Sequence, residues 1–240
     1  GAIAPPVAAF DNEQQRRANV PPAMKILVLI SQVPDTTARI AFTNNNTQYD
    51  ANGVTFIVNP YDEWYALVRA LELKEAAGAG SVTSITVGGA DNEATIRKAL
   101  AIGADDAVRI DVAALEAYQV ACEVAAYAKD KGFDLILAGK ETIDFNGGQV
   151  GAMVAELLDL PYVPLASKLD VAGTTATVER DVPGGVEVLE LQLPAVIGAA
   201  KGMAEQRIPN MRGIMAARTK PLTVVPSSKP ASVASTVQFE

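Results

Sequence analysis

The chain has 240 residues, 49% of them hydrophobic, which suits one large α/β domain or one domain with a smaller extension. The formal net charge of −8 argues against nucleic acid or an anionic membrane as the main partner, and no apolar run is long enough to cross a bilayer. Histidine is absent and cysteine occurs once, as Cys122, so a histidine base and an internal disulfide are both excluded. The composition favours a binder or carrier in a reducing compartment such as the cytoplasm.

Residues 1–23 are rich in proline and alanine and lack the apolar core of a signal peptide. Met24 is followed by the apolar run KILVLI, which is typical of a natural start. Residues 1–23 are therefore interpreted as a leader or appended segment.

Apolar runs and turn residues alternate over residues 24–160 and predict βαβ units around a parallel sheet. The expected strands are Lys25–Ile30, Val54–Val58, Val82–Val87, Ala107–Ile110 and Asp134–Ala138. The expected helices run from Asn59-Pro60 to Ala77, from Glu93 to Ile102, from about Ala113 to Lys131, and from Gln149 to Leu158. Asn59 is expected to cap the first helix and Asp91 or Asn92 the second. Val54–Val58 is expected to form a hairpin with Ile40–Tyr49.

From Pro161 the pattern changes to short β runs separated by glycine and proline. Val163–Val171, Ala176–Arg180, Val186–Leu191 and Ala195–Ala199 are expected to form an antiparallel addition to the sheet. The fold class is therefore α/β: an open, mainly parallel, Rossmann-like sheet with helices on both faces, an antiparallel addition and an irregular C-terminal tail. The expected divisions are residues 24–199 for the main domain, 200–219 for a partner-recognition loop and 220–240 for the tail.

Three glycine- or proline-containing turns follow strands, at the edge where open α/β sheets bind ligands. They are Asn59–Asp62, Val87–Ala90 and the loop GKETIDFNGGQVG from Gly139 to Gly151. Gly147 and Gly148 let backbone N–H groups approach a ligand, and the helix that follows favours a phosphate. The alternative is that the two glycines only turn a surface loop. Glu141 and Asp144 either form an acid/base pair or act as a helix cap and a solvated charge.

The 200–219 segment contains three of the five methionines and a cluster of basic residues. Methionine repacks easily and arginine attracts acidic surfaces, so the segment suits docking to several partners. The alternative is a long connector whose methionines lie in the core.

Four motifs in this chain resemble the β subunit of electron transfer flavoproteins, of the bacterial type. They are NPYDEWY from Asn59, TIRKALAIGAD from Thr95, LILAGKETID from Leu135 and IMAARTKPL from Ile214. The resemblance extends from Met24 to about Val225. It implies an adenine-nucleotide-binding fold and a heterodimer in which an α subunit holds most of the FAD while β binds a structural AMP.

The resemblance also implies roles for individual residues. The AMP contacts would be Leu29, Asn59, Pro60, Tyr61, Asp62, Val87, Asp144, Phe145, Asn146, Gly147, Gly148, Gln149, Val150, Gly151, Ala152, Met153, Val154 and Ala155. Thr36 and Tyr61 would face the flavin, and Asp181 would contact the α subunit. Met211 matches an anchoring leucine that enters dehydrogenases, and the expected docking residues are Met203, Arg207, Met211, Arg212 and Met215.

The chain departs from the family pattern in three places. The loop reads DFNGGQVGAM, where QVG resembles members that hold a second FAD and bifurcate electrons from NADH, whereas Met153 resembles the AMP type. The family's Leu-Pro-Asn anchor is replaced by Met211-Arg212-Gly213, and the family's C-terminal arm is shortened to end at Glu240. The expected function is an electron carrier between dehydrogenases and a quinone oxidoreductase; the alternatives are an NADH-oxidising bifurcating subunit and a stand-alone nucleotide-binding domain.

Overall fold

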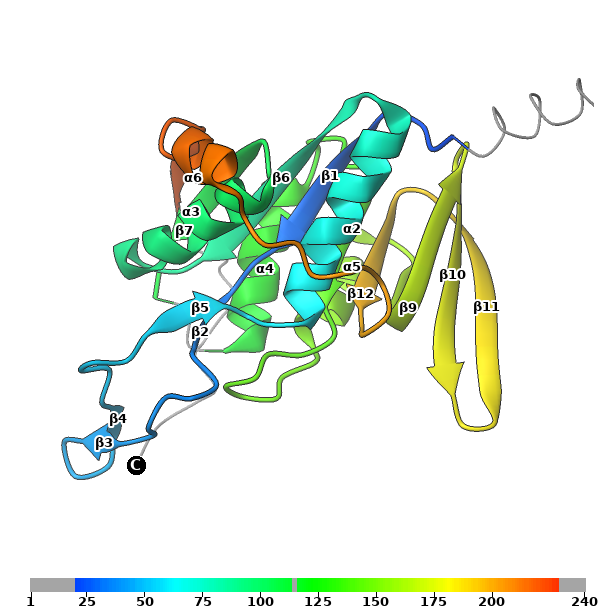
Figure 1. Ribbon diagram of the computed structural model, residues 1–240. Helices are drawn as coiled ribbons and strands as arrows, with labels where there is room; N and C mark the ends of the chain where they lie inside the picture. The colour runs from blue at the N-terminus through cyan, green and yellow to red at the C-terminus, as the bar shows by residue number, and fades with distance from the viewer. Residues whose placement is uncertain (1–19, 114–115, 229–240) are drawn as a thin grey trace, which may run out of the picture.

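A computed structural model describes residues 20–113 and 116–228 (Figure 1). In these residues the main sheet has nine strands in the order β11-β10-β9-β12-β8-β1-β6-β7-β13. Their bounds are β1 (Met24–Leu29), β6 (Gly80–Val87), β7 (Asp106–Asp111), β8 (Leu135–Gly139), β9 (Tyr162–Ala172), β10 (Thr175–Val182), β11 (Gly185–Gln192), β12 (Ala195–Ala199) and β13 (Leu222–Pro226). Neighbours from β12 to β13 pair in parallel, whereas β9, β10 and β11 pair antiparallel. The expected α/β fold is confirmed.

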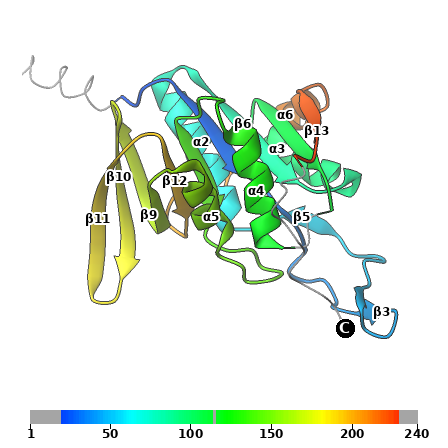
Figure 2. The same cartoon turned by 180° about the vertical axis from the view of Figure 1, so that it is seen from behind.

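Helices cover both faces of this sheet. Helices α2 (Asp62–Ala77) and α3 (Glu93–Ile102) lie on one face, and α4 (Ala117–Ala128) and α5 (Val150–Leu158) lie on the other (Figures 1 and 2). Alternate residues of β1 enter the two cores, which explains its continuous apolar sequence. Helix α4 is shorter than expected, and part of its expected first turn lies outside the described residues. No described helix is long and apolar enough to span a membrane.

The expected hairpin between Ile40–Tyr49 and Val54–Val58 is wrong. Strand β5 (Phe56–Val58) instead pairs antiparallel with β2 (Gln32–Pro34), while β3 (Phe42–Thr43) and β4 (Gln48–Tyr49) form their own small hairpin. Three asparagines, Asn44 to Asn46, adopt positive φ values of 50°, 57° and 66° and turn the chain back between β3 and β4. Asparagine tolerates this left-handed conformation better than most residues.

The C-terminal third also differs from expectation. Strand β12 was expected in the antiparallel addition, but it pairs in parallel with both β8 and β9 and all five of its residues are buried. A strand buried on both faces shows no alternation, so its sequence does not reveal its partners. The expected irregular tail is wrong over β13, which pairs in parallel with β7. Residues 229–240 of the expected tail and residues 1–19 of the expected leader lie outside the described residues.

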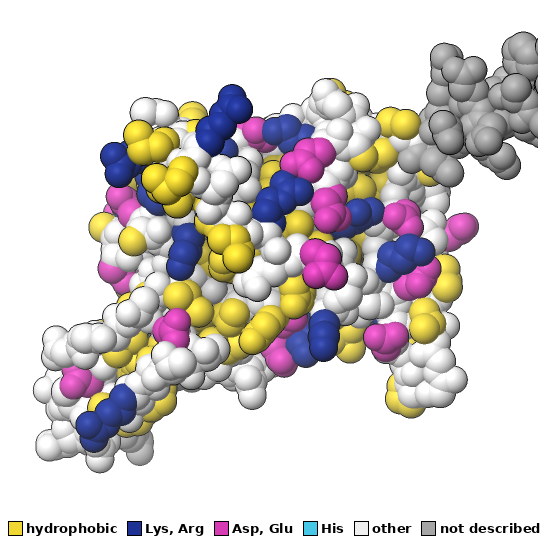
Figure 3. Space-filling model, in the orientation of Figure 1, with side chains coloured by type: hydrophobic (Ala, Val, Ile, Leu, Met, Phe, Trp, Pro, Cys, Tyr) yellow, Lys and Arg dark blue, Asp and Glu magenta, His cyan; other side chains and the backbone are white. Residues whose placement is uncertain are grey.

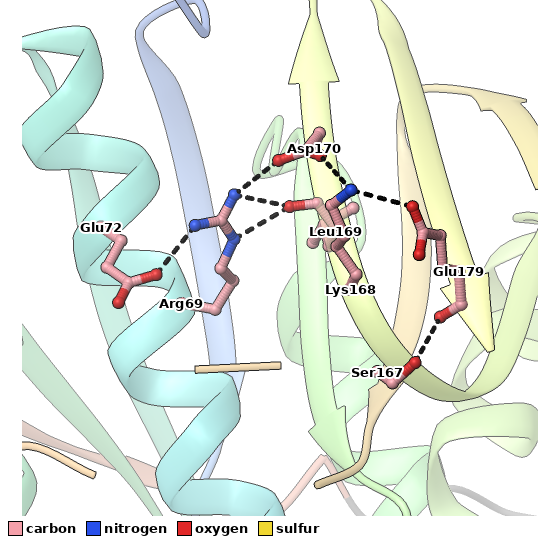
Figure 4. Close-up of polar contacts among 7 residues, drawn as sticks. All are labelled: Arg69, Glu72, Ser167, Lys168, Leu169, Asp170 and Glu179. Atoms are coloured by element: carbon pink, nitrogen blue, oxygen red, sulfur yellow. Dashed lines mark hydrogen bonds and ion pairs between the residues drawn. The ribbon is translucent and has the colours of Figure 1, made fainter. Parts of the chain in front are cut away.

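The antiparallel addition is fastened to α2 by the side chain of Arg69 (Figure 4). Its guanidinium donates to the carbonyl oxygen of Leu169 from Nε (2.9 Å) and Nη2 (2.6 Å), and pairs with Asp170 (3.0 Å) and Glu72 (2.8 Å). The two bonds to a strand carbonyl fix the height of β9 along α2, because a backbone acceptor moves only with its strand. Arg69 therefore links β9, the first strand of the antiparallel addition, to helix α2 on the parallel sheet.

Candidate functional site

The chain reverses its direction of winding between β1 and β8. After β1 it builds outward through β6 and β7, with α2 and α3 on one face, and then returns to β8 with α4 and α5 on the opposite face. The helices that follow β1 and β8, α2 and α5, therefore lie on opposite faces of the sheet (Figures 1 and 2). Open α/β sheets bind ligands in the crevice that this reversal creates at the carboxyl ends of the strands.

Asn59 links the two connections at this crevice. Its side chain is fully buried; its Nδ2 donates to the carbonyl oxygen of Glu141 (2.8 Å), and its Oδ1 accepts from the backbone N–H of Ile143 (3.0 Å). The expected capping role of Asn59 is therefore wrong: α2 has Tyr61 at its N-cap position, with φ 66° and no side-chain cap bond. The amide instead holds the Gly139–Gly148 loop against the turn that precedes α2.

The loop itself is shaped by close backbone contacts. The N–H of Thr142 donates to the carbonyl oxygen of Gly147 (3.2 Å), and the N–H of Phe145 donates to Asp144 Oδ1 (2.8 Å). A Cβ on Gly148 would lie 2.9 Å from the carbonyl oxygen of Lys140, so a larger residue there needs the backbone to move. Glu141 pairs with Lys140 (3.2 Å) and Asp144 is exposed; no described contact joins them as an acid/base pair.

Helix α5 starts directly after this loop. Its N-cap residue, Gln149, makes no side-chain cap bond within the part of the chain that the structure describes, so N–H groups of the first turn remain available to an anion. The ring of Phe145 at the loop is 80% exposed. Loop and helix together therefore offer backbone donors and an exposed aromatic ring, which suits a phosphate joined to a flat heterocycle.

Two carboxyl groups, those of Asp62 and Glu63, lie in the first turn of α2. The buried Glu63 carboxylate accepts from the N–H of Ser31 (2.6 Å) and from its hydroxyl (2.7 Å). Burial raises the pKa of Glu63 to about 8, with the Ser31 bonds opposing the rise. Burial also raises the pKa of the neighbouring Asp62 to about 6, although the charge of Lys140 opposes this.

Glu63 and Ser31 were missed by the sequence analysis. Acidic residues in a first turn usually face water and complement the helix dipole, so the DE pair gave no reason to expect burial. The available signal was Gly139, at the carboxyl end of β8. A Cβ on this glycine would lie 2.8 Å from Cγ and 3.0 Å from the backbone nitrogen of Glu63, so the strand approaches α2 as only glycine permits.

The structure brings most of the expected AMP contacts to this one edge, which we call the binding edge: the Asn59–Glu63 turn, the Gly139–Gly148 loop and the first turns of α5. One apolar cluster joins Leu29, Val87, Val150, Met153, Val154 and Ala155. The carbonyl oxygen of Gly88, next to Val87, accepts from the buried Arg109 (3.0 Å). Pro60 is half-buried, and Asn146 and Ala152 are exposed. Gly151 lies against the side chain of Tyr162: a Cβ built on the glycine would be 3.1 Å from both Cε2 and the hydroxyl oxygen of Tyr162.

The three residues expected near the flavin or the α subunit lie on the surface. Tyr61 is 56% exposed beside Tyr65, with ring centroids 6.4 Å apart. Thr36 lies in the exposed turn after β2, and Asp181 is exposed near the end of β10. Only Tyr61 belongs to the binding edge.

The expected docking residues divide into two groups. Met203 is buried in the core at 4% exposure, so it cannot contact a docking partner in this structure and its expected docking role is wrong. Met211 and Met215 are 73% and 55% exposed on the short helix α6 (Met211–Ala217), and Arg212 is exposed there too. Figure 3 shows hydrophobic and basic side chains gathered over α6.

Contacts with α2 and α3 hold the 200–219 segment in place. Arg207 pairs with both carboxylate oxygens of Glu75 (2.7 and 3.0 Å), and its carbonyl oxygen accepts from the indole N–H of Trp64 (3.1 Å). The side chain of Asn210 caps α6 by accepting from the N–H of Gly213 (2.8 Å). A Cβ on Gly213 would clash with the carbonyl oxygen of Ala101, so α6 packs closely against α3. The exposed methionines are thus held in place.

The fold and its binding edge define a doubly wound α/β protein whose reversal point has the features of a nucleotide site. Comparison with known proteins gives the family. Residues 47–230 match the model of the electron transfer flavoprotein domain. The chain is 42% identical to "Electron transfer flavoprotein subunit beta" of Bacillus subtilis over 203 residues, which cover 83% of this chain and 77% of that protein.

Two further relatives carry the same name. The protein of Syntrophomonas wolfei is 37% identical over 218 residues, covering 90% of this chain and 85% of its own length. The human protein is 35% identical over 207 residues, covering 84% and 81%. The chain therefore belongs to the electron transfer flavoprotein family, as a beta subunit.

Proposed function

We propose that this chain is the nucleotide-holding subunit of a heterodimeric electron carrier of the cytoplasm. In this proposal it binds AMP at the binding edge and forms one wall of an FAD site held mainly by the α subunit. The flavin supplies the redox chemistry, while the chain's own residues position and surround the nucleotide. Histidine is absent from the sequence, which suits a subunit that carries no acid/base step of its own.

The observation that carries this proposal is the double hydrogen bond of Asn59. It fixes the glycine loop against the start of α2 at the reversal point of the sheet, while the start of α5 keeps its N–H donors uncapped. The residues present suit AMP: backbone N–H groups for the phosphate, and an apolar wall around Leu29, Val87 and Val150 for the adenosine.

Nucleotide content tests the proposal directly. The chain is purified with its α subunit and denatured, and the released FAD and AMP are counted per heterodimer. One FAD and one AMP are expected. Two FAD molecules and no AMP would overturn the AMP assignment and favour the bifurcating alternative, to which the sequence Gln149-Val150-Gly151 is similar. Absence of any nucleotide would overturn both.

We further propose that α6 docks the dehydrogenases that reduce the flavin, after which electrons pass to a quinone oxidoreductase. Met211 is the most exposed residue of this helix among those that could enter an apolar pocket. Met211→Ala is expected to slow flavin reduction by the partner dehydrogenase about tenfold, the effect of losing roughly 1.4 kcal/mol of docking energy. The matched control is Leu157→Ala, which removes an exposed side chain from α5. Equal effects of the two variants would exclude a docking role for Met211.

A further inference from the structure

The Gly139–Gly148 loop contains an asparagine-glycine pair, Asn146-Gly147, at its most open point. Asn146 is exposed and has φ 50°. A Cβ built on Gly147 meets nothing within 4 Å, so this side of the residue faces open space. Within residues 20–113 and 116–228 the N–H of Gly147 donates no hydrogen bond, although its carbonyl oxygen accepts one from Thr142. The backbone nitrogen of Gly147 is therefore free to react.

The two sides of this open point are fixed. Asn59 holds Glu141 and Ile143 on one side, and α5 begins at Val150 on the other. Most of the residues between them are exposed, and among the described residues their hydrogen bonds are local: Phe145 to Asp144, and Thr142 to Gly147. Motion of the tip is thus possible without disturbing the fold, and such motion lets an asparagine side chain meet the next backbone nitrogen.

We propose that Asn146-Gly147 is a self-modification site that reacts when the binding edge is empty. The backbone nitrogen of Gly147 loses its proton and attacks Cγ of Asn146, a new C–N bond closes a succinimide ring, and the bond from Cγ to the side-chain nitrogen breaks as that nitrogen takes up a proton and leaves as ammonia. Water then opens the ring to leave aspartate or isoaspartate at position 146. The reaction consumes one water, releases one ammonia and needs no oxidant or reductant.

The consequence for the binding edge depends on the proposed nucleotide function. A carboxylate at position 146 adds a negative charge to a loop that already carries Asp144, and so opposes the binding of a phosphate. A bound phosphate in turn engages the N–H of Gly147 and orders the tip, which blocks the attack. The modification therefore marks subunits that have lost their nucleotide.

A second asparagine-glycine pair, Asn52-Gly53, provides an internal control. It lies in an exposed turn between β4 and β5, outside the binding edge, where Gly53 has φ 73° and the N–H of Val54 donates to the carbonyl oxygen of Ala51 (3.2 Å). Its reaction has no reason to depend on a nucleotide. The ratio of the two rates therefore removes effects of buffer, temperature and protein batch.

The test follows both pairs in the full chain, freed of nucleotide and incubated in mildly alkaline buffer with or without AMP. Peptide mass mapping detects replacement of NH by O, and AMP binding is measured in the same samples. Without AMP, the peptide with Asn146 is expected to react. AMP at about ten times its dissociation constant is expected to slow this reaction about tenfold, because about one tenth of the sites remain empty. The Asn52 peptide is expected to react equally in both samples.

Three results would contradict the proposal. An unreacted Asn146 beside a reacting Asn52, without AMP, would overturn the modification site. Equal rates at Asn146 with and without AMP, while AMP is bound, would overturn protection by the nucleotide. Reaction at Asn146 in a chain that binds no AMP would overturn the proposed nucleotide function and the link to it, but leave the modification site standing.

Two substitutions separate the chemistry from its consequence. Gly147→Ala is expected to suppress the reaction at position 146, because the methyl group hinders the attack and meets no neighbour in the fold. Asn146→Asp reproduces the charge of the product and is expected to weaken AMP binding about tenfold relative to Asn146→Gln, which is neutral. Equal AMP affinity of the last two variants would exclude an effect of the modification on binding.

Discussion

The binding edge and the 200–219 segment both contact α2 or the turn before it, and they differ in their polar contacts: those of the binding edge involve buried side chains, whereas the ion pair of the 200–219 segment is exposed. At the binding edge, the buried side chains of Asn59 and Glu63 make hydrogen bonds to partly buried partners. In the 200–219 segment, Arg207 and Glu75 form an ion pair at the surface. Burial makes the first attachment specific and costly to break, whereas solvent and salt weaken the second. The difference suits a permanently held ligand on one side and exchangeable partners on the other.

The largest effect is expected from Asn59→Ala. The change leaves the carbonyl oxygen of Glu141 and the N–H of Ile143 without their partner, at a cost of about 2–3 kcal/mol in the free energy of unfolding. It also frees the loop, so AMP should be lost during purification. Denaturant unfolding and nucleotide analysis measure the two effects. Asn52→Ala, at an exposed turn, is the matched control and should change the free energy of unfolding by less than about 0.5 kcal/mol. Similar losses in both variants would mean that the buried hydrogen bonds of Asn59 contribute no more to stability than an exposed asparagine does.

Glu63 predicts a pH dependence of stability. Its pKa is raised to about 8 in the folded chain, so the folded chain holds a proton that the unfolded chain has released. The free energy of unfolding should therefore fall as pH rises from about 4.5 to about 8 and level off above that. In Glu63→Gln this contribution disappears. The total fall in the free energy of unfolding between pH 4.5 and 8 should then be smaller by about 1–3 kcal/mol. Glu190→Gln, at an exposed position of β11, should keep the parent profile; an unchanged slope in Glu63→Gln would contradict the burial argument.

Gly139→Ala tests the close approach of β8 and α2. The new methyl group would lie 2.8 Å from Cγ of Glu63, and relieving this contact is expected to cost about 1–2 kcal/mol of unfolding free energy. Gly185→Ala makes the same change at the start of β11, where a Cβ meets nothing within 4 Å, and should be neutral. Urea midpoints of the two variants give the comparison. Equal midpoints would mean that α2 can yield to the methyl group.

The smallest effect is expected from Glu75→Gln. Arg207 holds the pKa of Glu75 below its ordinary value, but both side chains are partly exposed, so the loss should be less than about 1 kcal/mol. Added salt should reduce the difference between the variant and the parent. A loss as large as that of Asn59→Ala, measured in the same unfolding assay, would show that the 200–219 segment is held as firmly as the binding edge.

The sequence predicts elements well where a pattern is local. Helix α3 has the expected bounds, and the end of α2 at Gly78 follows from the left-handed conformation that glycine adopts there, with φ 66°. The pairing of β12 was not predictable, because five buried residues suit any central strand and the strand's partners are far away in the sequence. The pairing of strand β13 was also not predictable. Its residues are exposed or half-buried, as in a surface tail, and its partner β7 is far away in the sequence.

At the candidate site, glycines and motifs indicated the place but not the contacts. The loop and Asn59 were expected at one edge, and they meet there. The role of Asn59 was mistaken because asparagine before proline suits a helix cap, and only the packed structure shows the loop that competes for its side chain. Met203 was mistaken because methionine serves cores and docking surfaces equally well.

The hydrogen bond from Trp64 to Arg207 gives the chain an intrinsic fluorescence signal at its contact with the 200–219 segment. The chain has a single tryptophan, so all of its indole emission comes from this one position on α2. The indole N–H touches the backbone of the 200–219 segment, 143 residues further along the chain. Movement of that segment on contact with another protein is therefore expected to change the emission of the chain's single tryptophan. Association can thus be followed in solution without attaching a dye.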